Sequence, residues 1–409
     1  MSDRSFLESL EVVGIKLGLD QIRLLTEHLG RPQDHFPSIV VAGTNGKGSV
    51  TAMIERGLRA AGYRTGRYTS PHLVDLEERF VVDGRPVSTS DLDGVLDRVR
   101  AASAQLPAPP SYFEATTAAA LEIFREARVD VAVLEVGLGG RLDATNIVTP
   151  VAVAITSVDF DHQAYLGNTL DAIAGEKAGV IKPGCLVVLA ANPAIVRDIV
   201  RATCDQQQAR LIYAPDDVKV KTRLNKGTTT IDLTTSRHTY APVTLGLRGR
   251  HQIDNAIAAV RVLEELSASG RFPVSPDAIR TALEEVTWPA RLELVRFHDH
   301  DVLIDGAHNP AGARALTAYL REAYGRRLPM VVGVMRDKKV DELLLALAPA
   351  ASHFVFTATG TGRAATPEEL LRTAGRVAPT VPAIARDRPS EALTHAMSLG
   401  EPVVIAGSL

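Results

Sequence analysis

The chain has 409 residues, with 45 Lys and Arg against 48 Asp and Glu, so its formal net charge is −3. This balance excludes a strongly basic nucleic-acid binder, and a hydrophobic fraction of 45% excludes a disordered acidic chain. Two cysteines are too few for a disulfide framework, and the apolar runs are far shorter than the roughly 20 residues that cross a bilayer. We therefore expect a cytoplasmic globular protein of about two or three domains, with no membrane and no nucleic-acid partner.

Short runs rich in Val and Ile alternate with segments of helical spacing along most of the chain. The strand-like runs are residues 38–42, 129–136, 151–156, 185–190, 302–305, 330–334, 353–357 and 402–406. The helical segments are residues 49–61, 115–127, 171–180, 255–266, 276–286, 312–324 and 367–373. Several strand runs are apolar without alternation, which is typical of parallel strands covered on both faces. The pattern predicts an α/β protein built on a doubly wound sheet.

Residues 209–248 interrupt this alternation. They are rich in Thr, Val and charged residues, with turn signals at Pro215-Asp216 and at 225–227, and predict a small antiparallel β insertion. A new strand-helix series begins near Val295. We therefore expect an N-terminal domain at 1–290, a linker at 288–297 and a smaller, Rossmann-like α/β domain at 296–409.

A glycine-rich loop follows the first predicted strand and precedes a helix. Its members are Gly43, Thr44, Asn45, Gly46, Lys47, Gly48 and Ser49. Glycines let backbone N–H groups approach an anion, and the N-terminal end of a helix favours phosphate. Lys47 adds a positive charge, and a Ser hydroxyl in this place ligates Mg²⁺ in P-loops. The spacing departs from the standard P-loop and a plain glycine-rich turn is the alternative, but Lys47 and Ser49 favour phosphate binding.

The loop and seven further segments together resemble the folylpolyglutamate synthase/dihydrofolate synthase family of the Mur ligase superfamily. The segments are YTSPHL at 68–73, YFEATTAAA at 112–120, LEVGLGGRLDATN at 134–146, DFDHQAYLG at 159–167, GEKAGVIKPG at 175–184, HQIDNAIAA at 251–259 and DGAHNP at 305–310. The resemblance runs from about Lys16 to the C-terminus. It implies a carbon–nitrogen ligase that phosphorylates a substrate carboxylate with ATP and then lets the amine of L-glutamate displace phosphate. One departure is Ala290 in the linker, where relatives usually have glycine.

The resemblance also implies two Mg²⁺ sites. Ser49, Ser70 and Glu135 would hold the first ion, and Glu135, His162 and a carbamate on Lys177 would hold the second. Glu135 ends an apolar strand, where parallel sheets place ligand-binding residues, although a strand-end acid is more often a cap or a salt-bridge partner. A lone histidine is usually structural, and imidazole is an unusual Mg²⁺ ligand, so Mn²⁺ is expected to substitute. A monovalent cation such as K⁺ is a further candidate cofactor.

Lys177 is unusual on the sequence alone. It falls on the apolar stripe of its helix, with Ile173, Ala174 and Ile181. Either its stem passes apolar neighbours to reach water, or burial lowers its pKa and leaves a neutral amine that can capture CO₂ as a carbamate. The family match favours the carbamate and assigns catalytic roles to Lys177, Glu135 and His308.

Substrate contacts follow from the same resemblance. For ATP they are Asn255 on the adenine side, Arg291 in the linker, and Asp305 and His308 in the C-terminal domain. For the pterin-bearing substrate they are Ser111, Phe113, Asp143 and Ala144. Taken alone, Asn255 is more often a helix cap and Phe113 part of the core. A capped turn is plausible for Asn309, but less so for Asp305 and His308 together. Glutamate is not placed; residues 336–339 and Arg363 are the candidates.

Two other functions stay open. A Mur ligase acting on a UDP-linked cell-wall precursor normally has an additional domain before the glycine loop, where this chain has 42 residues. A P-loop regulatory NTPase would leave Lys177 and DGAHNP without a role. Within the family, the sequence does not decide between dihydrofolate synthase, folylpolyglutamate synthase and a bifunctional enzyme, which we favour. We expect a monomer whose two domains close over the substrates.

Overall fold

The computed structural model describes residues 3–11, 14, 16–225, 227–358 and 364–408. The chain divides into two compact units. Unit 1 comprises Met1–Lys219, Leu233–Tyr240 and Asp254–Val286, and unit 2 comprises Val220–Asp232, Ala241–Ile253 and Thr287–Leu409. Each unit is therefore discontinuous in sequence, which a single boundary at 288–297 does not capture.

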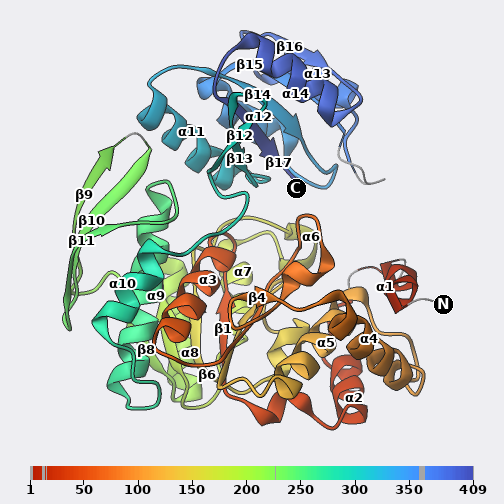
Figure 1. The fold of residues 1–409 in the computed structure, drawn as a ribbon, viewed down its shortest axis with the longest axis vertical. Coiled ribbons are helices and arrows are strands. Elements are labelled where there is room, and N and C mark those ends of the chain that lie inside the picture. The colour runs from red at the N-terminus through yellow and green to blue at the C-terminus, as the bar shows by residue number, and fades with distance from the viewer. Residues whose placement is uncertain (1–2, 12–13, 15, 226, 359–363, 409) are drawn as a thin grey trace. The chain divides into compact units, whose positions relative to one another are not determined.

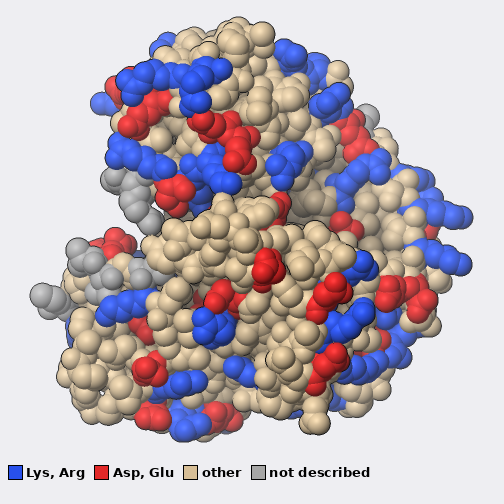
Figure 2. All heavy atoms as spheres, turned by 180° about the vertical axis from the view of Figure 1, so that it is seen from behind, with Lys and Arg blue, Asp and Glu red and all other residues tan. Residues whose placement is uncertain are grey.

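On the face drawn in Figure 2, acidic and basic side chains are interspersed.

Unit 1 is built on an eight-stranded sheet of order β4-β3-β2-β5-β1-β6-β7-β8. Figure 1 labels β1, β4, β6 and β8 of this sheet. The strands are β1 Ser38–Ala42, β2 Thr65–Tyr68, β3 Phe80–Val82, β4 Arg85–Pro86, β5 Val131–Glu135, β6 Pro150–Ile155, β7 Leu186–Leu189 and β8 Arg210–Tyr213. All neighbours from β2 to β8 are parallel, and β3 and β4 are antiparallel additions at one edge. In register, Val41 lies opposite Glu135 and Ala42 opposite Ile155, so β1, β5 and β6 end side by side.

Helices cover this sheet. They are α1 Asp3–Glu11, α2 Asp20–His28, α3 Lys47–Ala60, α4 Thr89–Ser103, α5 Tyr112–Glu126, α6 Gln163–Leu166, α7 Leu170–Ala178, α8 Ala194–Gln207, α9 His251–Ala268 and α10 Pro276–Glu284. The 3₁₀ turns η1 Pro32–His35, η2 Leu76–Arg79 and η3 Ala144–Ile147 lie between them. One core packs α4, α5, α7 and α8 against strand residues such as Val40 and Ile155. The predicted doubly wound domain is confirmed, and no helix in the described ranges meets the length and hydropathy needed to span a bilayer.

A separate three-stranded sheet of order β11-β10-β9 contains β9 Lys219–Asn225, β10 Thr228–Thr234 and β11 Thr239–Thr244. The cross-strand threonine pairs Thr230–Thr244 and Thr234–Thr239 run in opposite directions, so β10 and β11 are antiparallel. The predicted insertion is thus present, but its predicted start at 209 was wrong. Because β8 pairs in parallel with β7, Arg210–Tyr213 belongs to the large sheet.

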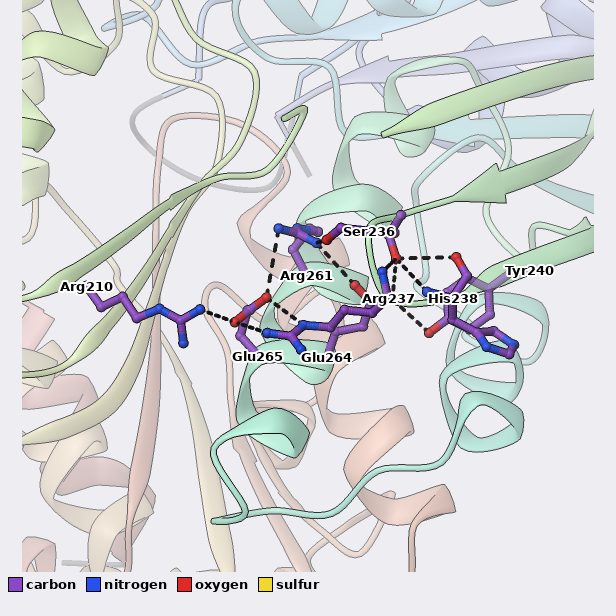
Figure 3. A network of polar contacts seen from close by, with 9 residues as sticks. Arg210, Ser236, Arg237, His238, Tyr240, Arg261, Glu264 and Glu265 are labelled. Atoms are coloured by element: carbon purple, nitrogen blue, oxygen red, sulfur yellow. Dashed lines mark hydrogen bonds and ion pairs between the residues drawn. The ribbon is translucent and has the colours of Figure 1, made fainter. Parts of the chain in front are cut away.

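The turn between β10 and β11 is tied to α9 by charged side chains (Figure 3). The Glu265 carboxylate, 2% exposed, accepts hydrogen bonds from Arg237 Nε and Nη2, both 2.8 Å away, and from Arg210 Nη2 at 2.6 Å. Its neighbour Glu264 accepts from Tyr240 Oη at 3.1 Å, and burial raises the pKa of Glu264. The buried Arg261 faces both carboxylates. These ion pairs fix the turn on the helix that carries Asn255.

Replacing Glu265 with Gln is expected to lower the free energy of unfolding by about 3 kcal/mol, because the buried Arg261 loses one of its two compensating charges. The matched control is Asp232→Asn, which breaks an ion pair with the exposed Arg223 and should change the free energy of unfolding far less, because water screens an exposed pair. Urea unfolding of both variants measures the difference. Equal losses would show that the network at Glu265 contributes no more than a surface pair.

Unit 2 contains a six-stranded sheet of order β12-β13-β17-β14-β15-β16. Its strands are β12 Glu293–Phe297, β13 His300–Asp305, β14 Leu328–Gly333, β15 Ala351–Phe356, β16 Ala383–Ala385 and β17 Val403–Gly407, all parallel except β12. Its helices are α11 Pro310–Tyr324, α12 Val340–Leu347, η4 Ala348–Ala350, α13 Pro367–Val377 and α14 Pro389–Leu399. A core around Leu316, Phe354 and Leu370 fills one face, and Ala392 and Ala396 of α14 pack on the other. This is the predicted smaller α/β domain.

Candidate active site

The glycine loop joins β1 to α3, and its backbone requires glycine at two points. Gly43 has φ +149°, and a Cβ there would lie 1.8 Å from Thr156 Oγ1. Gly46 has φ +87°, and a Cβ there would lie 2.4 Å from Asn255 Oδ1. Any larger residue would therefore displace the loop from its neighbours. The buried Asn255 of α9 thus lies against the loop, and its contact with adenine stays a prediction.

The segment that follows β6 holds the glycine loop in place. Thr156 Oγ1 donates to the carbonyl of Asn45 at 2.8 Å, and Thr44 N donates to the carbonyl of Ser157 at 2.7 Å. Thr44 Oγ1 also donates to Asp159 O and accepts from Asp159 N, both at 3.0 Å. The loop conformation is therefore set by β6 as well as by its own glycines.

Two cationic side chains meet carbonyl groups of this loop. Lys47, the first residue of α3, donates from Nζ to Thr44 O at 3.1 Å. Lys177 on α7 donates from Nζ to Gly43 O at 2.8 Å and is only 4% exposed. The Lys177 amine is therefore buried against the loop. This excludes the alternative in which the side chain extends past its apolar neighbours and places the amine in water.

Burial, together with the positive charge of Lys47, lowers the pKa of Lys177 to about 7, although the charges of Asp161 and Asp143 oppose the shift. Near pH 7 a substantial fraction of the amine is then neutral, whereas an exposed lysine remains protonated. A neutral amine is the form that reacts with CO₂. The observed burial therefore meets the chemical requirement for the predicted carbamate, which itself stays a prediction.

The LEVGLGGRLDATN segment positions the helix end that carries Lys177. Arg141 N donates to Glu176 O at 2.7 Å, and the Arg141 guanidinium pairs with the Glu176 carboxylate at 2.7 Å. Asn146 Nδ2 bridges Arg141 O at 2.8 Å and Gly179 O at 3.1 Å. The two motifs thus form one unit of structure around the buried lysine.

Glu135 is the last residue of β5 and is 6% exposed. Its Oε2 accepts a hydrogen bond from Ser70 N at 3.3 Å, so two of the predicted metal ligands are in contact. Ser49 lies buried in the first turn of α3, next to the loop that leaves β1. Since β1 and β5 are neighbours in register, the topology brings these oxygen donors to one edge of the sheet.

His162 follows β6 at the same edge of the sheet. It adopts the left-handed conformation with φ +50°, and its N–H donates to Asp161 Oδ1 at 2.9 Å. This conformation is unusual outside glycine and is common at functional sites. The half-buried ring precedes α6, and its role as a ligand stays a prediction.

The predicted folate residues are engaged by their own turns. Ser111 caps α5 in a capping box with Glu114. Asp143 accepts from Leu138 N at 2.8 Å and from Thr145 Oγ1 at 2.6 Å, and burial raises its pKa. Ala144 is buried beside it. These contacts within the protein are enough to account for a serine at 111 and an aspartate at 143. The assignment of these residues to folate binding therefore stays a prediction.

Phe113 is the one predicted folate residue with an aromatic face. Its ring centroid lies 6.0 Å from that of Tyr68, and a Cβ on Gly137 would lie 2.6 Å from Phe113 Cζ. The half-buried ring therefore packs over the backbone that follows Glu135.

In unit 2, DGAHNP forms a tight turn between β13 and α11. Asp305 ends β13 and accepts from Leu292 N at 3.0 Å. Burial raises the pKa of Asp305 to about 6, although the charge of Arg291 opposes the shift. His308 Nδ1 lies 2.9 Å from Gly306 O, and Asn309 caps α11 through Gly312 N at 2.8 Å. The capped-turn interpretation is thus correct for Asn309.

The linker holds Arg291 in place by backbone contacts. Arg291 Nη1 donates to Ala290 O at 2.8 Å, and Gly306 N donates to the same carbonyl at 2.9 Å. Ala290 itself has φ +54°, a left-handed conformation that costs an L-residue about 1–2 kcal/mol. The alanine that departs from the family pattern therefore stands where the backbone favours glycine.

Two domain families account for most of the chain. Residues 41–263 match the Mur ligase middle domain, and residues 290–409 match the Mur ligase glutamate ligase domain. A curated dihydrofolate synthase/folylpolyglutamate synthase from Mycobacterium tuberculosis is 38% identical over 377 residues, covering 87% of this chain and 77% of the relative. The chain belongs to the Mur ligase family. Within it, the chain is a ligase of the folylpolyglutamate synthase/dihydrofolate synthase type, as the motifs predicted.

Two solved structures of this type support the fold. The Mycobacterium tuberculosis folylpolyglutamate synthase complexed with ADP and AMPPCP has a TM-score of 0.91 and 34% identity, covering 99% of this chain and 96% of that chain. A bifunctional folylpolyglutamate synthase/dihydrofolate synthase with Mn, AMPPNP and L-glutamate bound has a TM-score of 0.86 and 30% identity, covering 100% and 95%.

The donor set of this Mur ligase fits a hard divalent cation at Glu135. In the described ranges, no three His, Cys, Asp or Glu side chains converge as a self-sufficient metal cluster. Mg²⁺ does not need one, because it commonly binds through one or two carboxylates together with substrate phosphates and water. At the edge of the sheet where the glycine loop begins, Glu135 supplies a carboxylate, and Ser70 and Ser49 supply hydroxyl oxygens.

Several residues that shape the ligase site were not assigned from the sequence. Thr156 and Ser157 hold the glycine loop, but nothing in their spacing marks them. Asp159 and Asp161 lie in the DFDH segment, where two acids flanking Phe160 next to a predicted metal ligand could have marked them as site residues. Asn192 lies outside every motif and is found only from its contacts.

Replacing Asp305 with Asn is expected to change the pH dependence of stability. The carboxyl pKa is about 6 in the native state against an ordinary value of 3.8, so between these values the native state binds the extra proton. Stability is therefore lost as pH rises through about 6. Because Asn carries no charge, Asp305→Asn should be up to about 3 kcal/mol more stable at pH 7.5 and indistinguishable near pH 4. Chemical unfolding from pH 4 to 7.5 measures the difference in free energy of unfolding between variant and wild type. A difference that does not change with pH would refute the raised pKa of Asp305 as its cause.

Proposed function

We propose that this ligase uses ATP to add L-glutamate to a pterin-bearing carboxylate, either dihydropteroate or a reduced folate, and that it accepts both. The observation that carries the proposal is the convergence of the glycine loop, the Glu135–Ser70 pair and the buried Lys177 at the carboxyl end of one parallel sheet. The name of the Mycobacterium tuberculosis relative and the L-glutamate bound to the solved bifunctional enzyme support the choice of substrates.

The first chemical step activates the carboxylate. A carboxylate oxygen of the acceptor attacks the γ-phosphorus of ATP, the bond to the β-phosphate oxygen breaks, and an acyl phosphate and ADP form. The two reactants are both anions, so the site must supply positive potential. In this chain the N-terminal end of α3, the glycine-loop N–H groups and Lys47 supply it, with Gly43 to Ser49 as the nucleotide-binding segment.

The second step forms the amide. The neutral amino group of glutamate attacks the acyl carbon, the bond from that carbon to the phosphate oxygen breaks, and the ammonium proton must leave. His308 is our candidate for accepting this proton. A carbonyl oxygen can only accept a hydrogen bond, so His308 Nδ1, which faces Gly306 O, carries the ring hydrogen. Nε2 is then the basic nitrogen. Arg291 and Asp305 remain proposed nucleotide contacts.

Metal and carbamate roles are part of the proposal. Ser49, Ser70 and Glu135 would hold one Mg²⁺ and Glu135, His162 and carbamylated Lys177 the other, with Mn²⁺ able to replace Mg²⁺. When bound, these cations would neutralise charge on the transferred phosphoryl group. The Mn bound to the solved relative supports the exchange. A K⁺ site remains a candidate.

The pterin-bearing substrate and glutamate each need a binding site. For the pterin ring we propose the face of Phe113, with Ser111, Asp143 and Ala144 around it. For glutamate, a pocket of about 290 Å³ in unit 2 is lined in part by Arg336 and Glu369, whose side chains pair at 3.3 Å. Arg363, the other candidate, lies outside the described residues. The predicted monomeric state and cytoplasmic location stay predictions.

Release of ADP from purified protein tests this function. We expect release that requires L-glutamate together with dihydropteroate, and separately with tetrahydrofolate. Activity with only one acceptor would reduce the proposal to a monofunctional enzyme. ADP release that ignores both acceptors would instead indicate a regulatory NTPase, and release that requires a UDP-linked peptide precursor would indicate a cell-wall ligase.

A further inference from the structure

Asn192 lies in the connection between β7 and α8, outside every motif that carries the family resemblance. Its side chain makes three hydrogen bonds, all to backbone groups. Oδ1 accepts from Val158 N at 2.8 Å, and Nδ2 donates to Thr156 O at 2.9 Å and to Ala190 O at 3.1 Å. One amide therefore joins the backbone that follows β6 to the backbone that follows β7.

The segment held by Asn192 has two tasks in the site. Thr156 and Ser157 hold the glycine loop through Asn45 and Thr44. Four residues beyond Val158, the same segment presents His162. A shift of this segment would move the nucleotide loop and the proposed second metal ligand together.

The three contacts require an amide at this position. One backbone N–H needs an acceptor and two carbonyls need donors, which matches the acceptor oxygen and the two N–H groups of a primary amide. An aspartate would keep the acceptor for Val158 N but place a second acceptor against both carbonyls. An alanine would leave all three backbone groups to find other partners.

We propose that Asn192 is a positioning residue that sets the glycine loop and the His162 segment for binding of the metal–nucleotide complex. The inference rests on the proposed function for the identity of that ligand. Asn192 acts on the site through the backbone at 156 and 158, which it ties to Ala190 O. Its effect should therefore appear first in affinity for the metal–nucleotide complex.

The test compares Asn192→Ala and Asn192→Asp with wild type by calorimetric titration with Mn²⁺ and AMPPCP. Loss of a residue that orients metal ligands typically costs 10–100-fold in metal affinity, so we expect Kd for Mn·AMPPCP to rise by at least about 10-fold in both variants. The matched control is Val196→Ala, which removes buried volume from the first turn of α8, just beyond this connection, and has no part in these hydrogen bonds. It should lower the melting temperature and leave Kd unchanged.

Unchanged Kd in a folded Asn192 variant would overturn the proposal, as would an equal rise in Val196→Ala. If Asn192→Ala does not fold, Asn192→Asp, which is isosteric, decides alone. The experiment measures Kd for Mn·AMPPCP and not turnover, so its result does not depend on whether the protein ligates glutamate. Wild-type protein that binds Mn·AMPPCP but does not ligate glutamate would defeat the proposed function and leave the inference about Asn192 testable, whereas wild-type protein that does not bind it would defeat both.

Discussion

Glu135→Gln protein is expected to fold normally and to lose at least about 10³-fold in kcat at saturating substrates. Gln fills the same volume, and its amide oxygen can still accept the Ser70 N–H, so the backbone contact survives. What disappears is the negative charge that would hold a divalent cation against the phosphates. Coupled ADP-release kinetics at several Mg²⁺ concentrations measure the loss.

The control for this variant is Glu55→Gln in the same unit. Glu55 is also buried, but its carboxylate accepts from Thr65 Oγ1 on β2 at 2.6 Å, a contact that holds α3 to the sheet, and from Arg59 Nε within α3 at 3.0 Å. This variant should lose stability and keep its kcat. A folded Glu135→Gln enzyme with native turnover would remove the metal role assigned to Glu135.

Lys177 is expected to carry a carbamate in the active enzyme and to be indispensable. Because only the neutral amine reacts with CO₂ and the pKa is lowered to about 7, carbamate should be scarce below pH 6 and accumulate as pH rises through 7. Protein supplied with ¹³C-bicarbonate should show a carbamate resonance with this pH profile. Lys177→Met should lose the resonance and about 10³-fold in kcat.

Lys182→Met is the matched control for Lys177. Lys182 follows the same helix, is half-buried, and has its pKa lowered by burial as well. It is not placed at the glycine loop, so its loss should leave both the resonance and kcat unchanged. Fully active wild-type protein without a carbamate resonance would refute the modification.

Sequence patterns predicted the elements that are both buried and regular. The run at 38–42 coincides with β1. The apolar stripe marked Lys177 as unusual and left burial or access to water open, and the structure shows that the side chain is buried. The glycine loop and Glu135 were placed at the correct edge because parallel strands end together. In these cases, local pattern and tertiary environment agree.

Other features depend on contacts that no local pattern encodes. The strand β8 at Arg210–Tyr213 is short and half-exposed, so it was assigned to the insertion, and only its pairing with β7 reveals its place. The helix α8 was missed although its apolar residues recur at helical spacing. Asn192 could not be found in advance, because its three partners lie on two different loops.

Transfer of ¹⁸O from the acceptor into phosphate tests the central claim most directly. If ATP activates the acceptor carboxylate at this site, dihydropteroate labelled with ¹⁸O in that group should place one labelled oxygen in the phosphate released with each amide formed. Mass spectrometry of the phosphate measures this. Amide formation accompanied by unlabelled phosphate would contradict the account, because the carboxylate oxygen would never have been bonded to phosphorus.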